Sequence, residues 1–249
     1  KLVDSSTYGS KMPRASWNFV GDCMVSIAPA DEQRAIADFL DHETAKIDML
    51  VAKKWTLVDR LKEKRVALIS RTVTRGLPPE AARVAGLDPS PMVKPSGADW
   101  FGDVPKHWIA AQLRRYTRFI TSGSRGWAEY YADSGAIFIR IANLTRDSIR
   151  LDLAELQHVD PPSGAEGERT RVFVGDVLFS ITAYLGSVGV ADQLVAGAYI
   201  NQHIALVRLH QRSVAPQFVA YAVLSDVGQA QLAGQGYGGT KVQLALDDV

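Results

Sequence analysis

A stretch without proline or glycine, residues 31–75, decides the fold of this chain and reads DEQRAIADFLDHETAKIDMLVAKKWTLVDRLKEKRVALISRTVTR. Asp31 comes two residues after a proline and is a favourable N-cap residue. At the other end, Gly76 is suited to a C-terminal cap, and the prolines at 78–79 prevent the helix from continuing. The pattern predicts one helix over 31–76, about 65–70 Å long at about 1.5 Å per residue, which is more than a compact domain needs.

Apolar residues in this stretch repeat every seven residues, as they do in a coiled coil. Lys54 and Lys64 fall on the same seam and weaken it, whereas Val51 and Val58 widen the apolar stripe. The helix could cover this stripe against its own domain, but its length favours antiparallel pairing with another long helix. The residues expected at the helix interface are Ile36, Leu40, Ile47, Leu50, Leu57, Leu61 and Leu68.

The pattern changes after the helix. Five of the eleven prolines lie in residues 77–97, which is typical of a linker, and a globular domain is expected to begin near Trp100. In that domain, short apolar or alternating runs bounded by Gly, Asn, Asp or Pro predict strands. The predicted strands cover 136–142, 172–174, 176–181 and 203–209, and helices are predicted over 217–224 and near 107–119.

A weak internal echo suggests that the chain is built from tandem units. Residues 8–19 resemble residues 238–249 when Lys11 is aligned with Lys241, 230 positions later. We therefore predict an α+β chain in which a mixed domain is joined to a long helix, with the helix that would follow the second domain missing. Its parts are the tail of a first domain over 1–30, the long spacer helix over 31–76, a Pro-rich linker over 77–97 and a second domain over 98–249.

Several stretches together resemble the specificity subunits of type I restriction–modification systems. The resemblance is most specific over residues 8–108 and looser afterwards. In the long helix it rests on 31–41, 44–48, 61–70 and 73–77, and on its flanks on 12–15 and 96–108. In the second domain it rests on 175–178, 201–202 and 239–241.

The resemblance implies a DNA-recognition subunit without catalysis of its own. Each target-recognition domain would read one half of a split site in double-stranded DNA, while paired long helices set the spacing between the halves. The helices would also dock the methyltransferase (modification) subunits, which carry the S-adenosylmethionine chemistry, and through them the restriction subunit. Because a second helix is expected to be missing, a homodimer formed through the long helix would complete the spacer.

Candidate DNA contacts are dispersed along the second domain, which holds thirteen basic and fifteen acidic side chains. Arginine can neutralise phosphate or bind guanine, glycine and small hydroxyl residues let the backbone approach phosphate, and Asn or Gln amides suit adenine. Each candidate also has a structural alternative, such as a surface ion pair or a satisfied backbone group. The residues expected to contact DNA are Arg114, Arg118, Ser122, Ser124, Arg125, Arg140, Asn143, Tyr184, Asn201, Gln202, Tyr237 and Lys241.

Composition argues against other classes of protein. The formal net charge is +1, Cys23 is the only cysteine, and the five histidines have no metal-ligand spacing, so we expect no disulfide, no zinc site and a reducing, cytoplasmic compartment. No apolar run is long enough to span a membrane. Residues 160–163 lack the aromatic residue of an amino-methyltransferase motif, and residues 234–241 lack the spacing of a phosphate loop. We therefore expect no cofactor on this chain.

Two other interpretations stay open. The chain could be the recognition part of a fused restriction enzyme and methyltransferase whose catalytic part is absent from the sequence. It could also be a coiled-coil scaffold whose globular domain binds only protein. Methyl transfer by the pure chain would favour the first, and failure to retard random-sequence DNA at low salt would favour the second.

Overall fold

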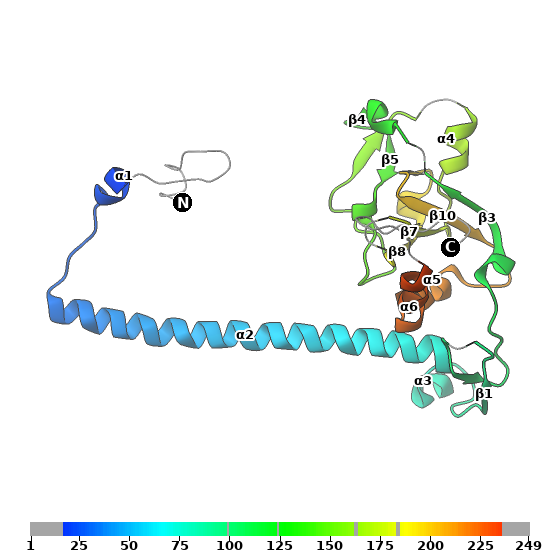
Figure 1. Cartoon of the computed structure of the whole chain (residues 1–249), viewed down its shortest axis with the longest axis horizontal. Helices are drawn as coiled ribbons and strands as arrows, with labels where there is room; N and C mark the ends of the chain where they lie inside the picture. The colour runs from blue at the N-terminus through cyan, green and yellow to red at the C-terminus, as the bar shows by residue number, and fades with distance from the viewer. Residues whose placement is uncertain (1–16, 99, 124, 162–163, 183–184, 236–249) are drawn as a thin grey trace. The chain divides into compact units, whose positions relative to one another are not determined.

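The computed structural model describes residues 17–235 except 99, 124, 162–163 and 183–184 (Figure 1). The chain divides into two units, Lys1–Val58 and Asp59–Val249. The first contains a short helix, α1 (Trp17–Gly21), and the beginning of the long helix α2 (Ala30–Arg75). The second contains the end of α2 and the sheets. The mixture of helix and sheet confirms the predicted α+β class.

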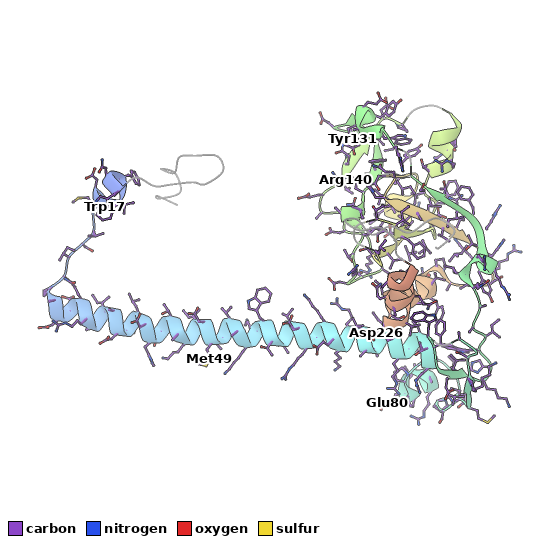
Figure 2. All side chains as sticks on the ribbon, in the orientation of Figure 1. Trp17, Met49, Glu80, Tyr131, Arg140 and Asp226 are labelled. Carbon is purple, nitrogen blue, oxygen red and sulfur yellow. The ribbon has the colours of Figure 1, made fainter. Side chains whose placement is uncertain are left out.

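Helix α2 runs without a break for 46 residues, in agreement with the predicted helix. Asp31 and Glu32 lie in its first turn and Arg75 in its last, which suits the helix dipole at both ends. The seven predicted interface residues are between 47% and 59% exposed. Side chains project from the helix all along its length, Met49 among them (Figure 2). Within the described residues, the apolar stripe of α2 is therefore largely uncovered.

The segment predicted as a Pro-rich linker contains short regular elements. Helix α3 (Pro79–Val84) follows α2, and strand β1 (Val93–Pro95) pairs antiparallel with β2 (Asp103–Pro105). Ala82 is buried, and its carbonyl oxygen accepts a hydrogen bond of 2.8 Å from the Leu87 N–H. The prolines thus begin α3 and end β1, positions where a missing N–H costs little.

The first four-stranded sheet has the order β3 (Thr117–Ser122), β10 (Ile204–Leu209), β7 (Val177–Ser180), β8 (Val188–Val190), and all its pairs are antiparallel. Helix α5 (Pro216–Leu224) packs against one face through Val219 and Leu224, and α6 (Asp226–Gln235) follows it. Strand β10 is buried on both faces, because Ala205 and Val207 belong to one core and Ile204 and Leu206 to another.

The second four-stranded sheet has the order β4 (Tyr131–Ala132), β6 (Gln157–Val159), β5 (Ala136–Ile139), β9 (Tyr199–Ile200). Only the β5–β9 pair in this sheet is parallel. Ile139 and Ile200 from this sheet join Leu178 and Leu206 of the first in one core cluster, so the two sheets share a core. The remaining helical elements are α4 (Ala165–Thr170) and the 3₁₀ turns Leu113–Tyr116, Trp127–Tyr130, Ile141–Asn143 and Gln193–Val195.

Two predicted elements are wrong. The helix predicted near 107–119 is instead the 3₁₀ turn Leu113–Tyr116 followed by strand β3, where β-branched and aromatic residues favour the extended backbone. Residues 172–174 form no strand. The Val172 N–H donates to the Ala198 carbonyl oxygen at 2.8 Å, which makes this stretch a short connection beside β9.

A buried ion pair joins the start of β7 to the end of β10. The guanidinium of Arg208 donates to both carboxylate oxygens of Asp176, at 2.8 and 2.7 Å, and the Asp176 side chain is 1% exposed. The guanidinium carbon lies 4.1 Å from the centre of the Phe173 ring, and the Phe173 N–H also donates to the carboxylate, at 2.8 Å. Such bidentate pairing fixes the two strands in register.

Candidate nucleic-acid interface

Three segments that are far apart in the sequence meet at one end of the first sheet. Strand β3 ends there at Ser122 and strand β7 at Ser180, whereas β10 begins there at Ile204. The Gly123 N–H donates to the Ile204 carbonyl oxygen at 3.2 Å, and the Ile181 N–H donates to the His203 carbonyl oxygen at 3.0 Å. We call this place the polar edge and define it as Ser122, Gly123, Thr182, Gln202 and His203.

The glycine at the polar edge is required by packing within the chain. A Cβ atom on Gly123 would lie 2.1 Å from the carbonyl oxygen of Ile200 and 2.2 Å from that of Asn201. Its φ angle is ordinary, so the constraint is one of space alone. The sequence predicts that glycine here lets the backbone approach a phosphate, but in the structure the absent side chain makes room for the backbone that precedes β10.

The side chains of the polar edge form a short hydrogen-bonded row. The Thr182 hydroxyl lies 2.8 Å from Nδ1 of His203, and Nε2 of Gln202 lies 3.1 Å from Nε2 of the same ring. All three side chains are half-buried. Of the predicted contacts, Ser122 and Gln202 lie here together.

Two predicted contacts, Asn143 and Asn201, are buried and use their amides inside the domain. Asn143 is 3% exposed; its Oδ1 accepts from the Arg140 N–H at 2.8 Å, and its Nδ2 donates to two backbone carbonyl oxygens at 2.8 and 3.1 Å. Asn201 is 8% exposed, and its Oδ1 accepts from the His203 N–H at 3.2 Å. Both side chains stabilise backbone turns in this conformation, Asn143 through both amide atoms and Asn201 through Oδ1.

The predicted arginines do not form one cluster. Arg114 lies in the 3₁₀ turn before β3 and donates to Oε1 of Gln112 at 2.9 Å, whereas Arg125 follows the other end of the strand. Six strand residues separate the two ends by about 20 Å. Arg118 is exposed near the start of β3. Arg140 is half-buried at the end of β5, and its Nε has no hydrogen-bond partner among the described residues (Figure 2).

One arginine that the sequence analysis did not select lies against the polar edge. Arg169 of helix α4 donates to the Ser122 carbonyl oxygen at 3.1 Å and also bonds the Thr121 hydroxyl. Its partners are 47 and 48 residues away in sequence, so no local pattern could have placed it there. Thr182 and His203 were given no role for the same reason. Four predicted contacts, Ser124, Tyr184, Tyr237 and Lys241, lie outside the described residues.

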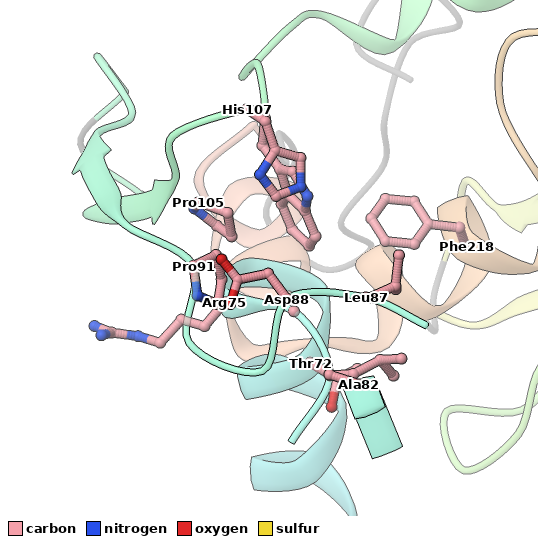
Figure 3. A pocket seen from close by; sticks show the side chains of 12 residues that line it. Thr72, Arg75, Ala82, Leu87, Asp88, Pro91, Pro105, His107 and Phe218 are labelled. Carbon is pink, nitrogen blue, oxygen red and sulfur yellow. The ribbon is translucent and has the colours of Figure 1, made fainter. Parts of the chain in front are cut away.

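A separate pocket of about 260 Å³ lies where the last turn of α2 meets the domain (Figure 3). Its aromatic side is made by Trp108 and Phe218, whose ring centres are 6.2 Å apart in an edge-on arrangement. Further along, α2 is held by a hydrogen bond of 2.8 Å from the Asp226 N–H to the Ser70 hydroxyl. None of the described predicted DNA contacts lines this pocket.

Other kinds of site were sought among the residues that the structure describes. No group of histidine, cysteine, aspartate or glutamate side chains there could hold a metal ion. No described helix is both long and apolar enough to cross a membrane. What the second unit offers is a polar edge bordered by exposed arginines, on an α+β domain joined to the end of a long helix.

The whole chain was compared with known proteins. No family model matches the chain. The Escherichia coli type I restriction enzyme EcoBI specificity subunit is 21% identical over 251 residues, covering 99% of this chain and 51% of that protein. The chain thus spans about half the length of the curated relative it matches.

One solved structure with a TM-score above 0.5 has a similar fold. A chain from a type I R-M system, solved in a study of complex assembly and conformational transition, has a TM-score of 0.52 and 19% identity, covering 99% of this chain and 53% of its own. The HsdS subunit of Thermoanaerobacter tengcongensis has a TM-score of 0.46 and 18% identity over 99% of this chain and 55% of its own. The chain resembles the type I restriction–modification specificity subunits, as its sequence predicts.

Proposed function

We propose that this chain is a non-catalytic DNA sequence-recognition subunit of a type I restriction–modification complex. In this role the domain over residues 98–249 reads one half of a split DNA site. Helix α2 sets the spacing between the halves and docks the methyltransferase subunits, which bind S-adenosylmethionine. The restriction subunit joins the complex through these partners.

The observation that carries this proposal is the uncovered apolar stripe of α2, on a helix of 46 residues with a mixed domain at its C-terminal end. Most of the stability of a helix in water comes from covering such a face, so an exposed stripe of this length calls for a partner. A second copy in antiparallel orientation would cover it and hold two domains at opposite ends of one rod.

The polar edge supports binding of double-stranded DNA through a local patch. Arg169 is exposed and donates to the Ser122 carbonyl oxygen, and Arg125, three residues after Ser122 in the sequence, is exposed as well. Because the domain as a whole carries no excess of positive charge, affinity has to come from a few phosphate contacts together with base contacts. Each neutralised phosphate contributes about −0.9 to the slope of log K against log salt.

The proposal is tested by co-purifying the chain with its methyltransferase subunit and mapping the bases that the complex methylates on genomic DNA. We expect methylation at one defined split sequence, and none from the purified chain with S-adenosylmethionine alone. Methyl transfer by the pure chain would contradict the non-catalytic role. Complete failure of the chain to retard duplex DNA at low salt would contradict the recognition role.

A further inference from the structure

We propose that Gln202 recognises an adenine in the major groove of duplex DNA, and that His203, held by Thr182, is the positioning residue that orients the Gln202 amide for this contact. The inference rests on the proposed function, because it names the base class and the positioning device of the same DNA-binding edge. It is carried by the row of hydrogen bonds that joins the three side chains.

The chemistry of the row gives its bonds one direction. Nε2 of Gln202 carries two hydrogens and cannot accept, so across 3.1 Å it donates to Nε2 of His203. That ring nitrogen is therefore unprotonated, and a neutral imidazole then carries its hydrogen on Nδ1. Nδ1 lies 2.8 Å from the Thr182 hydroxyl oxygen, which can accept that hydrogen. A threonine hydroxyl can donate as well as accept, so Thr182 holds the ring in either tautomer, and the orientation of the Gln202 amide sets the direction of the row.

The backbone around this row is fixed independently of DNA. The His203 N–H donates to Oδ1 of Asn201 at 3.2 Å, and the His203 carbonyl oxygen accepts from the Ile181 N–H at 3.0 Å. Both ends of the imidazole are bonded, at Thr182 and at Gln202. Because the Gln202 amide is bonded to this fixed ring, it can bind a base with less loss of conformational entropy than a free side chain would.

The oriented amide leaves a specific pair of groups for a ligand. Its Oε1 and its second N–H have no hydrogen-bond partner among the described residues, and the side chain is half-buried rather than enclosed. An amide oxygen beside an amide N–H is the bidentate complement of adenine, which presents its N6 amino group as donor and N7 as acceptor. With Nε2 of His203 unprotonated, the ring accepts from this orientation of the amide and disfavours the reversed one, in which Oε1 would face a nitrogen without a hydrogen.

The test is selection of binding sites from a pool of duplex DNA with a randomised stretch, using the purified full chain. We expect the unaltered chain to enrich a consensus that contains an adenine read by Gln202. Gln202→Ala should abolish the preference at that position, which for a bidentate contact is about 5- to 150-fold, and leave the other positions in place.

Variants of His203 separate positioning from simple folding. In His203→Gln the new side-chain oxygen can replace Nε2 as the acceptor, so the adenine preference should be retained. In His203→Asn the shorter side chain cannot reach Gln202, so the same preference should be lost. Thr182→Ser and Thr182→Val form a second pair with a smaller change in volume, and only the valine, which lacks the hydroxyl, should lose the preference. A purely structural role would instead weaken binding at all positions equally.

A base analogue makes the test independent of folding. Replacing the selected adenine by 7-deazaadenine removes the N7 acceptor, so it should weaken binding by the unaltered chain and have no further effect on Gln202→Ala. An adenine preference that survives Gln202→Ala or His203→Asn would overturn the inference while leaving the proposed function intact. The absence of any consensus with the unaltered chain would overturn both.

Discussion

Replacing Leu57 by alanine should weaken self-association of the chain, whereas replacing Met49 by alanine should leave it nearly unchanged. The two side chains are almost equally exposed, at 56% and 55%, and lie on the same helix. They differ in their position within the seven-residue repeat, since Leu57 is on the predicted seam and Met49 is not. Leucine, methionine and alanine all favour the helical conformation, so neither change should weaken α2 itself.

The expected loss of dimerisation free energy follows from the exposed fraction of the Leu57 side chain. Full burial of a leucine side chain contributes about 1.5–3 kcal/mol, and roughly half of this remains available to Leu57 on pairing. An antiparallel dimer contains the position twice, so the loss is about 1.5–3 kcal/mol per dimer. This corresponds to a dimer dissociation constant raised about 10- to 150-fold. Leu57 lies near the middle of α2, so it remains in the overlap over a range of registers.

Sedimentation equilibrium over a wide concentration range measures this constant directly, and far-ultraviolet circular dichroism checks that the helix content is unchanged. A change below twofold in Leu57→Ala, or an equal change in Met49→Ala, would refute the reasoning. So would a clean monomer mass for the unaltered chain at micromolar concentration, because the stripe would then have no partner in a second copy.

The remaining predictions concern the second unit. Arg208→Ala leaves the buried Asp176 carboxylate without its cation and should destabilise the domain by about 3–5 kcal/mol. We expect the melting temperature to fall by about 6–20 °C. An unchanged melting curve would contradict the buried ion pair. Gly123→Ala forces backbone atoms apart, so it should lower the urea midpoint of unfolding more than Gly126→Ala does. Gly126 has open space around it, and its substitution should lower the unfolding free energy by about 1 kcal/mol only because its φ is positive. A larger effect of Gly126→Ala would contradict the close approach of the Ile200 and Asn201 carbonyl groups to Gly123. Arg125→Ala should reduce the salt slope of DNA binding by about 0.9, measured by fluorescence anisotropy, whereas Arg212→Ala, beyond the opposite end of β10, should not alter it.

Features encoded by local sequence could be predicted, and those that depend on distant pairing could not. The limits of α2 follow from a proline just before it, an uninterrupted run of helix formers and a glycine just after it, all of which are readable within a few residues. The helix begins at Ala30, so Asp31, predicted as the N-cap, lies in the first turn instead. Strands β5, β7 and β10 follow from apolar runs bounded by turn residues. Strand β3 was missed because two arginines precede its apolar residues and suggest a helix. The meeting of Ser122 with the turn 201–203 depends on the register between β3 and β10, which neither stretch specifies alone.

The two buried asparagines show that a polar side chain beside a strand can serve the fold. Asn143 accepts a hydrogen bond from the backbone of Arg140, and Asn201 accepts one from the backbone of His203. Each asparagine therefore holds the turn that carries a neighbouring polar side chain. Replacing Asn201 by alanine should lower stability and weaken both the overall affinity for DNA and the adenine preference, since it releases the turn that carries Gln202 and His203. Replacing Gln202 should alter only the preference at one base, because its free amide groups support no part of the fold. If Gln202 reads a base as proposed, a substitution at this half-buried position would change the preferred base without rebuilding the buried Asn201.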